Sequence, residues 1–151
     1  MILRKAREEE INDLTDISKA AFATDIHFGA KVSDGPPGYD SYEWHRQMFI
    51  GNHLFIFKNE SEIIGGAILF VDGPSLYVGR IFLSPKFFRQ GYGRKLMEEI
   101  ENLYSEVEII RLDTPIWNER TNHFYRKCGY VETGRDQESI YFEKKINIGK
   151  N

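Results

Sequence analysis

The chain has 151 residues, which fits one domain, since domains commonly run to about 100–150 residues. Its composition is 41% hydrophobic, 14% aromatic and 28% charged, which provides ample material for a core and excludes a disordered chain or a disulfide scaffold. The net charge of −3 argues against nucleic-acid binding, which relies on a basic surface, so we expect no nucleic-acid partner.

Cysteine and histidine usage argues against a metal protein. Cys128 is the only cysteine, and the four histidines (His27, His45, His53, His123) show no metal-binding spacing, so we expect no metal. The first eleven residues lack the apolar core of a signal peptide, and no apolar run approaches the ~20 residues of a membrane span. We therefore expect a cytoplasmic protein without a membrane partner.

Apolar residues in the first half recur at helical spacing and then at strand spacing. Glu8–Phe22 follows the helical period with acids in its first turn, after a short strand at Ile2–Arg4. Turn-forming residues predict a loop over Thr24–Tyr39, and Asp40–Phe49 is typical of a short aromatic helix. Three strands follow across short turns, at Leu54–Phe57, Ile63–Val71 and Leu76–Leu83. Such short turns predict an antiparallel meander.

The second half alternates between helix and strand after a loop at Ser84–Gln90. The expected elements are a helix over Gly91–Tyr104, a strand over Val107–Leu112, a helix over Asn118–Lys127 ended by Gly129, and a closing strand over Ile140–Ile146. No repeat or linker interrupts them. The sequence predicts one domain over residues 1–151 of the α/β (α+β) class, with a mixed central sheet, an antiparallel N-terminal meander and flanking helices.

Two glycines, Gly91 and Gly93, open the predicted helix directly after the loop. Glycine lets backbone approach a ligand closely, and the free N–H groups of a first helical turn bind anions. Arg94 and Lys95 are cations at the end of the helix where the dipole disfavours them, which favours a bound anion. Leu96 stands where a Walker loop needs Ser or Thr and where a dinucleotide fingerprint needs its third glycine. The loop alone is also compatible with a bare connector.

Two blocks of sequence match the motifs of one family. Leu83-Ser84-Pro85 is followed by Phe88-Arg89-Gln90-Gly91-Tyr92-Gly93, which fits Gln/Arg-x-x-Gly-x-Gly/Ala except at its first residue. The stretch Asn118–Tyr130 fits Asn-x-x-Ala…Phe-Tyr-x-Lys-x-Gly-Phe, with Thr121 in place of Ala and Tyr for the final Phe. In these blocks the chain resembles the GNAT superfamily of acetyl-coenzyme A-dependent N-acetyltransferases. The blocks occur in the family's order and cover roughly the C-terminal half.

The resemblance implies acetyl-coenzyme A as the cosubstrate and a set of residues that hold it. Backbone groups of Ile81, Phe82 and Leu83 would bind the pantetheine arm, and a bulge there would aim an N–H at the thioester oxygen. Asn118 would hydrogen-bond the pantetheine. The pyrophosphate would be wrapped by Arg89, Gln90, Gly91, Tyr92, Gly93 and Arg94. By sequence alone, Ile81–Leu83 is equally typical of any buried strand.

The resemblance also implies catalytic roles. Tyr125 matches the tyrosine that gives a proton to the leaving thiolate, although a tyrosine packed beside Phe124 fits the same position. Tyr77 stands where some members carry a strand glutamate as the base. Ribosomal-protein-type N-terminal acetyltransferases carry a glutamate where this chain has Asp113, which is therefore our predicted base, acting directly or through water. An aspartate before Thr114-Pro115 is also a common turn former.

The predicted function is transfer of an acetyl group from acetyl-coenzyme A to an amine by direct attack in a ternary complex. Cys128 lies in the last turn of its helix, where the dipole raises a thiol pKa, which argues against an acetyl-cysteine intermediate. Because Tyr77 replaces the strand glutamate, a non-catalytic acyl-coenzyme A sensor is the alternative. Another acyl donor, such as succinyl- or propionyl-coenzyme A, is a third.

The amine acceptor is not identified by the sequence. An aromatic set in the N-terminal half would line its pocket through cation–π contacts or simply pack helices on the sheet: His27, Phe28, Tyr39, Tyr42, Trp44 and His45. Nearby acids would attract a cationic acceptor or merely face solvent: Asp25, Asp34, Asp40 and Glu43. The family resemblance also implies that a homodimer can form, without indicating an interface.

Overall fold

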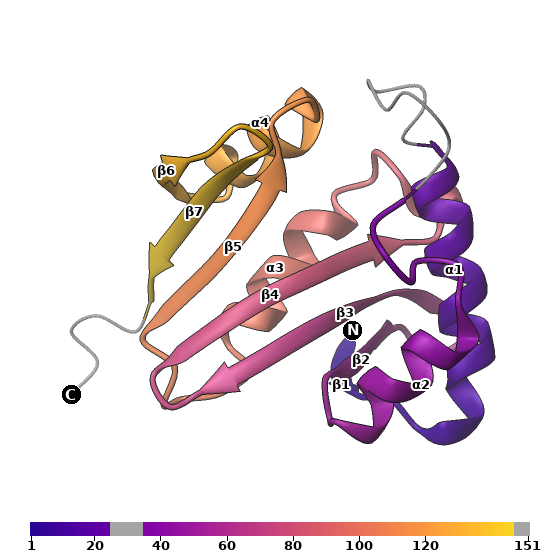
Figure 1. Ribbon diagram of the computed structural model, residues 1–151. Coiled ribbons are helices and arrows are strands. Elements are labelled where there is room, and N and C mark those ends of the chain that lie inside the picture. Colours follow the sequence, from indigo (N-terminus) through magenta and orange to yellow (C-terminus); the bar gives the residue numbers. More distant parts are fainter. Residues whose placement is uncertain (25–34, 147–151) are drawn as a thin grey trace.

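The computed structural model describes residues 1–24 and 35–146. Its strands form one seven-stranded mixed sheet with the order β1-β2-β3-β4-β5-β7-β6 (Figure 1). Their bounds are β1 Ile2–Lys5, β2 Leu54–Lys58, β3 Ile63–Asp72, β4 Ser75–Leu83, β5 Ile109–Pro115, β6 Val131–Arg135 and β7 Ser139–Lys145. Among these described strands only β4 and β5 pair in parallel, and every other pair is antiparallel. The predicted mixed sheet with an N-terminal meander is confirmed.

Helices cover both faces of the sheet. α1 (Ile11–Ala23), which follows the 3-10 turn η1 (Glu8–Glu10), and α2 (Tyr42–Ile50) share one apolar cluster with the first face. α3 (Tyr92–Glu101) and α4 (Glu119–Lys127) pack on the other face, with a second 3-10 turn, η3 (Pro85–Phe87), before α3. None of the described helices is long and apolar enough to span a bilayer.

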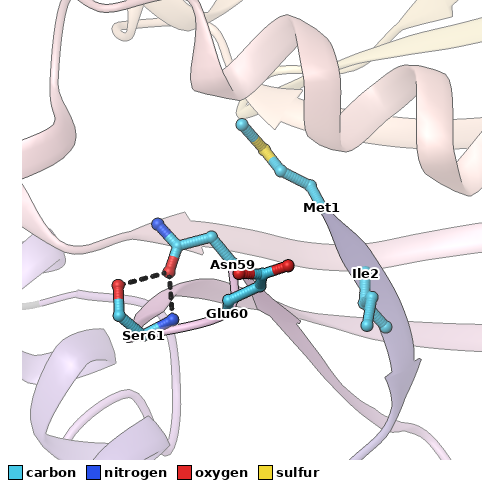
Figure 2. A pocket seen from close by; sticks show the side chains of 5 residues that line it. All are labelled: Met1, Ile2, Asn59, Glu60 and Ser61. Atoms are coloured by element: carbon cyan, nitrogen blue, oxygen red, sulfur yellow. Dashed lines mark hydrogen bonds between the residues drawn. The ribbon is translucent and has the colours of Figure 1, made fainter.

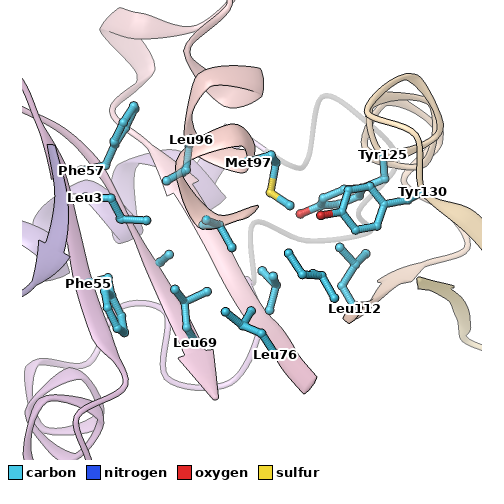
Figure 3. Packing of buried hydrophobic residues seen from close by; sticks show 14 of the residues in the cluster. Leu3, Phe55, Phe57, Leu69, Leu76, Leu96, Met97, Leu112, Tyr125 and Tyr130 are labelled. Carbon is cyan, nitrogen blue, oxygen red and sulfur yellow. The ribbon is translucent and has the colours of Figure 1, made fainter. Parts of the chain in front are cut away.

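The larger core lies between the sheet and the second helix layer. Leu96 and Met97 of α3 pack with Tyr125 of α4 over Leu76 and Leu112 of the strands (Figure 3). The three aliphatic leucines and Met97 are at most 3% exposed. Burying each such side chain stabilises the fold by about 1.5–3 kcal/mol, so this layer holds α3 and α4 firmly against β4 and β5.

The main differences from the sequence prediction are one missed strand and shifted ends of α3 and β5. The strand β6 was not predicted, because Val131–Arg135 carries one large apolar residue and lies at the sheet edge, where burial imposes no apolar alternation. α3 ends at Glu101 rather than Tyr104. β5 begins two residues later than predicted and continues to Pro115, so Asp113 is a strand residue, paired with Tyr141, and the turn interpretation of Asp113 is wrong.

Candidate active site

The parallel ladder between β4 and β5 is short. Its register runs from Ser75↔Ile109 to Val78↔Leu112 and then stops, and Figure 1 shows the two strands diverging beyond it. Past that point β4 remains paired with β3 and β5 with β7. The backbone edges that face each other across the opening therefore have no strand partner, which leaves hydrogen-bonding groups available to a bound chain.

A cleft of about 1230 Å³ occupies this opening. It is lined by both strands, the end of α1, the start of α3 and one side of α4 as far as Tyr125. Most residues predicted from the sequence line it: Ile81, Phe82, Leu83, Arg89, Gly91, Gly93, Arg94, Asp113, Asn118 and Tyr125. Gln90 and Tyr92 do not line it. Gln90 Nε2 donates to Lys86 C=O at 2.9 Å, and the Tyr92 ring packs edge-on against Phe87.

A β-bulge bends β4 just where the cleft opens. Ile68 pairs with Arg80 and the next residue, Leu69, pairs with Val78, so Gly79 is left opposite neither. A Cβ at Gly79 would lie 2.9 Å from the Phe70 ring, which excludes a side chain there without rearrangement. The bulge reverses the alternation along β4, so Val78 points to the α3 side and Arg80 to the α1 side. The bulge at Gly79 lies two residues before Ile81–Leu83, the segment in which a bulge was predicted.

The turn before α3 presents backbone amides to the cleft. Arg89 and Gly91 both adopt positive φ, at 63° and 83°, which turns the chain sharply into the helix. The first hydrogen bond of the helix runs from Lys95 N–H to Gly91 C=O, so the amides of residues 92–94 precede the ladder. A Cβ at Gly91 would meet nothing within 4 Å, whereas one at Gly93 would lie 3.2 Å from Phe124. This end of α3 has the geometry of an anion site.

Tyr125 and Asp113 reach the cleft from opposite faces of the sheet. Tyr125 is 5% exposed and packs edge-on against Phe124 and Tyr130, and its hydroxyl has no hydrogen-bond partner among the described residues. Burial raises the pKa of Tyr125, so the phenol stays protonated at neutral pH. Leu112 on β5 points into the core with Tyr125, and the alternation of a strand puts Asp113 on the other face.

The carboxylate of Asp113 is hydrogen-bonded across the sheet. Tyr77 Oη donates to Asp113 Oδ1, joining β4 to β5 on the α1 side of the opening. Burial, and then the neighbouring Asp113, raise the pKa of Tyr77, so it remains a donor. Tyr77 stands where some family members carry a strand glutamate. Its hydrogen bond thus holds Asp113, the residue that we predicted as the base.

A buried polar network fixes the loop between β5 and α4. Asn118 Oδ1 caps α4 by accepting from Thr121 N–H at 3.1 Å, and its Nδ2 has no partner among the described residues. Asn122, which is 3% exposed, accepts from Thr114 Oγ1 and donates to the carbonyls of Pro115 and Ile116, each at 3.3 Å. Sequence analysis did not single out Asn122 or Thr114. Polar residues in a helix and a strand become recognisable as a network only when their packing is known.

Cys128 ends α4 and is partly buried. Burial and then Glu101 raise the pKa of its thiol, which makes it a poor nucleophile at neutral pH. Gly129 follows with φ of 93°, and Tyr130 N–H donates to Tyr125 C=O at 3.0 Å, so the helix ends as predicted.

The aromatic residues predicted for the acceptor pocket differ in burial and in packing. His45 is fully buried, and its Nδ1–H donates to Ser41 C=O at 2.8 Å. Trp44 packs on the ring of His45 and on the guanidinium of Arg80. Arg80 lines the cleft and was not singled out by the sequence analysis. Tyr42 is exposed. The predicted residues His27, Phe28, Asp25 and Asp34 lie outside the described part of the chain.

A second hollow, of about 530 Å³, lies at the edge of the sheet between β1 and the β2–β3 turn (Figure 2). Asn59 Oδ1 accepts from both the N–H and the hydroxyl of Ser61, so its polar atoms serve the turn itself. Among the residues that the structure describes, no group of three or more His, Cys, Asp or Glu side chains is placed to hold a metal ion.

Solved structures share this fold. The PaiA N-acetyltransferase of Thermoplasma acidophilum, solved with coenzyme A, superposes with a TM-score of 0.80 at 19% identity, over 95% of this chain and 98% of that one. A GNAT-family acetyltransferase of Streptococcus agalactiae gives 0.83 at 18% identity, over 97% and 95%. These two acetyltransferase structures therefore share the fold of this chain.

The sequence assigns the family directly. Residues 12–130 match the profile of the acetyltransferase (GNAT) family, and the chain belongs to this family. It is also similar to the uncharacterized N-acetyltransferase YesJ of Bacillus subtilis, with 28% identity over 112 residues. That match covers 62% of each chain, so the protein spans about three fifths of the length of this relative.

Proposed function

We propose that this protein is an N-acetyltransferase that moves an acetyl group from acetyl-coenzyme A to an amine by direct attack in a ternary complex. The observation that carries the proposal is the opening between β4 and β5. One cleft there joins the uncapped start of α3 to Tyr125 on one face of the sheet and to Asp113 on the other. A donor and an acceptor that enter from opposite faces meet at this opening.

The residues of the cleft fit the chemical groups of coenzyme A. The amides at residues 92–94, with Arg89 and Arg94 beside them, suit a diphosphate because the helix dipole and free N–H groups both favour anions. The unpaired edge of β4 over Ile81–Leu83 suits an extended, amide-containing arm, which adds to a strand as a peptide does. The Nδ2 of Asn118, which bonds to none of the residues that the structure describes, provides a further donor.

Transfer needs a base, an acid and a polarised carbonyl. The bound thioester supplies the electrophilic carbon. Asp113 takes a proton from the acceptor's ammonium group, directly or through water, so that the neutral amine attacks the thioester carbon, and Tyr77 orients the Asp113 carboxylate. Tyr125 donates its proton toward the departing sulfur, for which its protonated state at neutral pH is suited. Backbone N–H groups beside the Gly79 bulge stabilise the developing negative charge on the carbonyl oxygen.

The glycines of the turn provide the decisive experiment. Gly91→Asp and Gly93→Asp add bulk and negative charge where the diphosphate binds, so coenzyme A binding measured by calorimetry should be lost. Gly73→Asp is the matched control for Gly91→Asp, because Gly73 also has positive φ, at 59°, with nothing within 4 Å of its Cβ position, but lies outside the cleft. Binding by both cleft variants at the wild-type level would refute the site.

Turnover separates the enzyme from a non-catalytic sensor. The wild-type protein should consume acetyl-coenzyme A and release free thiol when amines are supplied. Binding without turnover over a broad amine and peptide panel would favour an acyl-coenzyme A sensor instead. Cys128→Ala should retain activity, since transfer is direct, and its inactivity would contradict that mechanism.

A further inference from the structure

Arg80 is held rigidly on the acceptor side of the cleft. It follows the Gly79 bulge on β4, and its Cζ lies 4.3 Å from the Trp44 ring centroid and 5.8 Å from that of Phe22. Its Nη2 donates to Pro37 C=O at 2.9 Å. These contacts come from α1, α2 and the segment before α2, so the guanidinium has a fixed place facing the α1 side of the opening.

The cation of Arg80 has no counter-charge in the described chain. No carboxylate among residues 1–24 and 35–146 pairs with it, and its Nη1 is buried without a hydrogen-bond partner. Burial lowers the pKa of Arg80 to about 10, so it is still charged at neutral pH. A desolvated charge without an opposite charge is costly, and an anion that enters the cleft would offset that cost.

We propose that Arg80 binds a carboxylate of the acceptor, and that the acceptor is therefore an amino acid, with its amine at Asp113 and its acid at Arg80. This inference rests on the proposed function, which places the reacting amine beside Asp113. Tyr77, the hydrogen-bond partner of Asp113, precedes Arg80 by three positions on β4, which is at most about 10 Å of strand. An amino acid whose reacting amine and carboxylate are separated by a side chain can span such a distance.

The same geometry disfavours a polyamine as the acceptor. The ring faces of Trp44 and Phe22, which would hold an ammonium group, are already taken by the guanidinium of Arg80. A second positive charge nearby would be repelled in a site of low polarity.

The test compares acids with their neutral analogues. Acetylation of the protein amino acids, of their carboxamides and of spermidine is measured with the wild type, Arg80→Gln and Arg80→Lys. The wild type should prefer at least one amino acid over its carboxamide and over spermidine. Arg80→Gln should lower kcat/KM for that acid by about 10- to 100-fold while changing its carboxamide by less than about threefold, and Arg80→Lys should retain part of the preference. Comparing the acid-to-amide ratio between variants cancels the different amine basicities.

Arg111→Gln is the matched control. Arg111 lies on the adjacent strand opposite Tyr77, is exposed, pairs with Glu143 at 3.5 Å and is not part of the cleft, so the acid-to-amide ratio should not change. An equal loss for acid and amide in Arg80→Gln would show a purely structural role and overturn the proposal. So would a wild type that binds coenzyme A but neither binds nor acetylates any of the acids. Absence of coenzyme A binding by the wild type would instead refute the proposed function.

Discussion

Truncating Asn122 should cost the fold about 3 kcal/mol. Asn122→Ala removes one buried hydrogen bond, from Thr114 Oγ1, and leaves that hydroxyl without its acceptor. It also removes two partly buried hydrogen bonds, to the carbonyls of Pro115 and Ile116, of which the Pro115 carbonyl still accepts from Asn118 N–H. A net bond contributes about 1 kcal/mol, and an unsatisfied buried group costs about 1–3 kcal/mol. Because 1.4 kcal/mol is a factor of ten, the folded-to-unfolded ratio should fall by roughly 100-fold.

Urea unfolding measures this change as a shift in midpoint at constant slope. Thr114→Val should cost about 1–2 kcal/mol alone, and the double variant should cost about 1 kcal/mol less than the sum, because both partners are then gone. Asn102→Ala is the control, since Asn102 is exposed and bonds only to the Glu98 carbonyl, and should change stability by less than about 0.5 kcal/mol. A cost below that value for Asn122→Ala, or full additivity with Thr114→Val, would refute the network.

Three further predictions concern catalysis and pH. Tyr125→Phe should lower kcat by about 100-fold with the KM for acetyl-coenzyme A nearly unchanged; wild-type kcat would exclude Tyr125 as the acid. Asp113→Asn should lower kcat/KM by about 100-fold at neutral pH and less at high pH, where free amine is abundant; a deficit independent of pH would contradict its role as the base. Burial lowers the pKa of His45, so the unfolded chain binds the extra proton, and stability should be full above pH ~6.5 and fall as the pH drops below it. Urea midpoints at pH 7.5 and 5.5 measure this, and His45→Gln should flatten the difference.

Most elements of the fold were predictable because their patterns are local. Glu8–Phe22 and Leu76–Leu83 repeat apolar residues at the period of their own secondary structure, and they form α1 with its preceding turn and β4. β6 was missed because an edge strand buries little and shows no such period. The end of β5 was misplaced because Thr114-Pro115 is typical of a turn, whereas pairing with β7 keeps both residues in the strand.

The candidate site, like the fold, has residues that the sequence predicted and residues that it did not. The glycines of the turn before α3 were found because positive φ and close approach leave a local signature in the sequence. Tyr77 and Asp113 are 36 residues apart, and their contact exists only because β4 and β5 lie side by side. In the sequence, Arg80 is an ordinary cation in a strand. Its guanidinium is fixed by the rings of Phe22 and Trp44, which come from two different helices.

The amino-acid sequence by itself determined the order of the described helices and strands except β6, and the glycine turn before α3, since these follow from neighbouring residues and backbone conformation. Tertiary structure alone decided which side chains share the opening: that Tyr125 and Asp113 meet it from opposite faces, and that Arg80 enters it without a counter-charge from residues 1–24 or 35–146. The physical reason is that burial, counter-charge and hydrogen-bond partners are properties of pairs of residues distant in the chain. No local pattern records how such pairs meet when the sheet assembles.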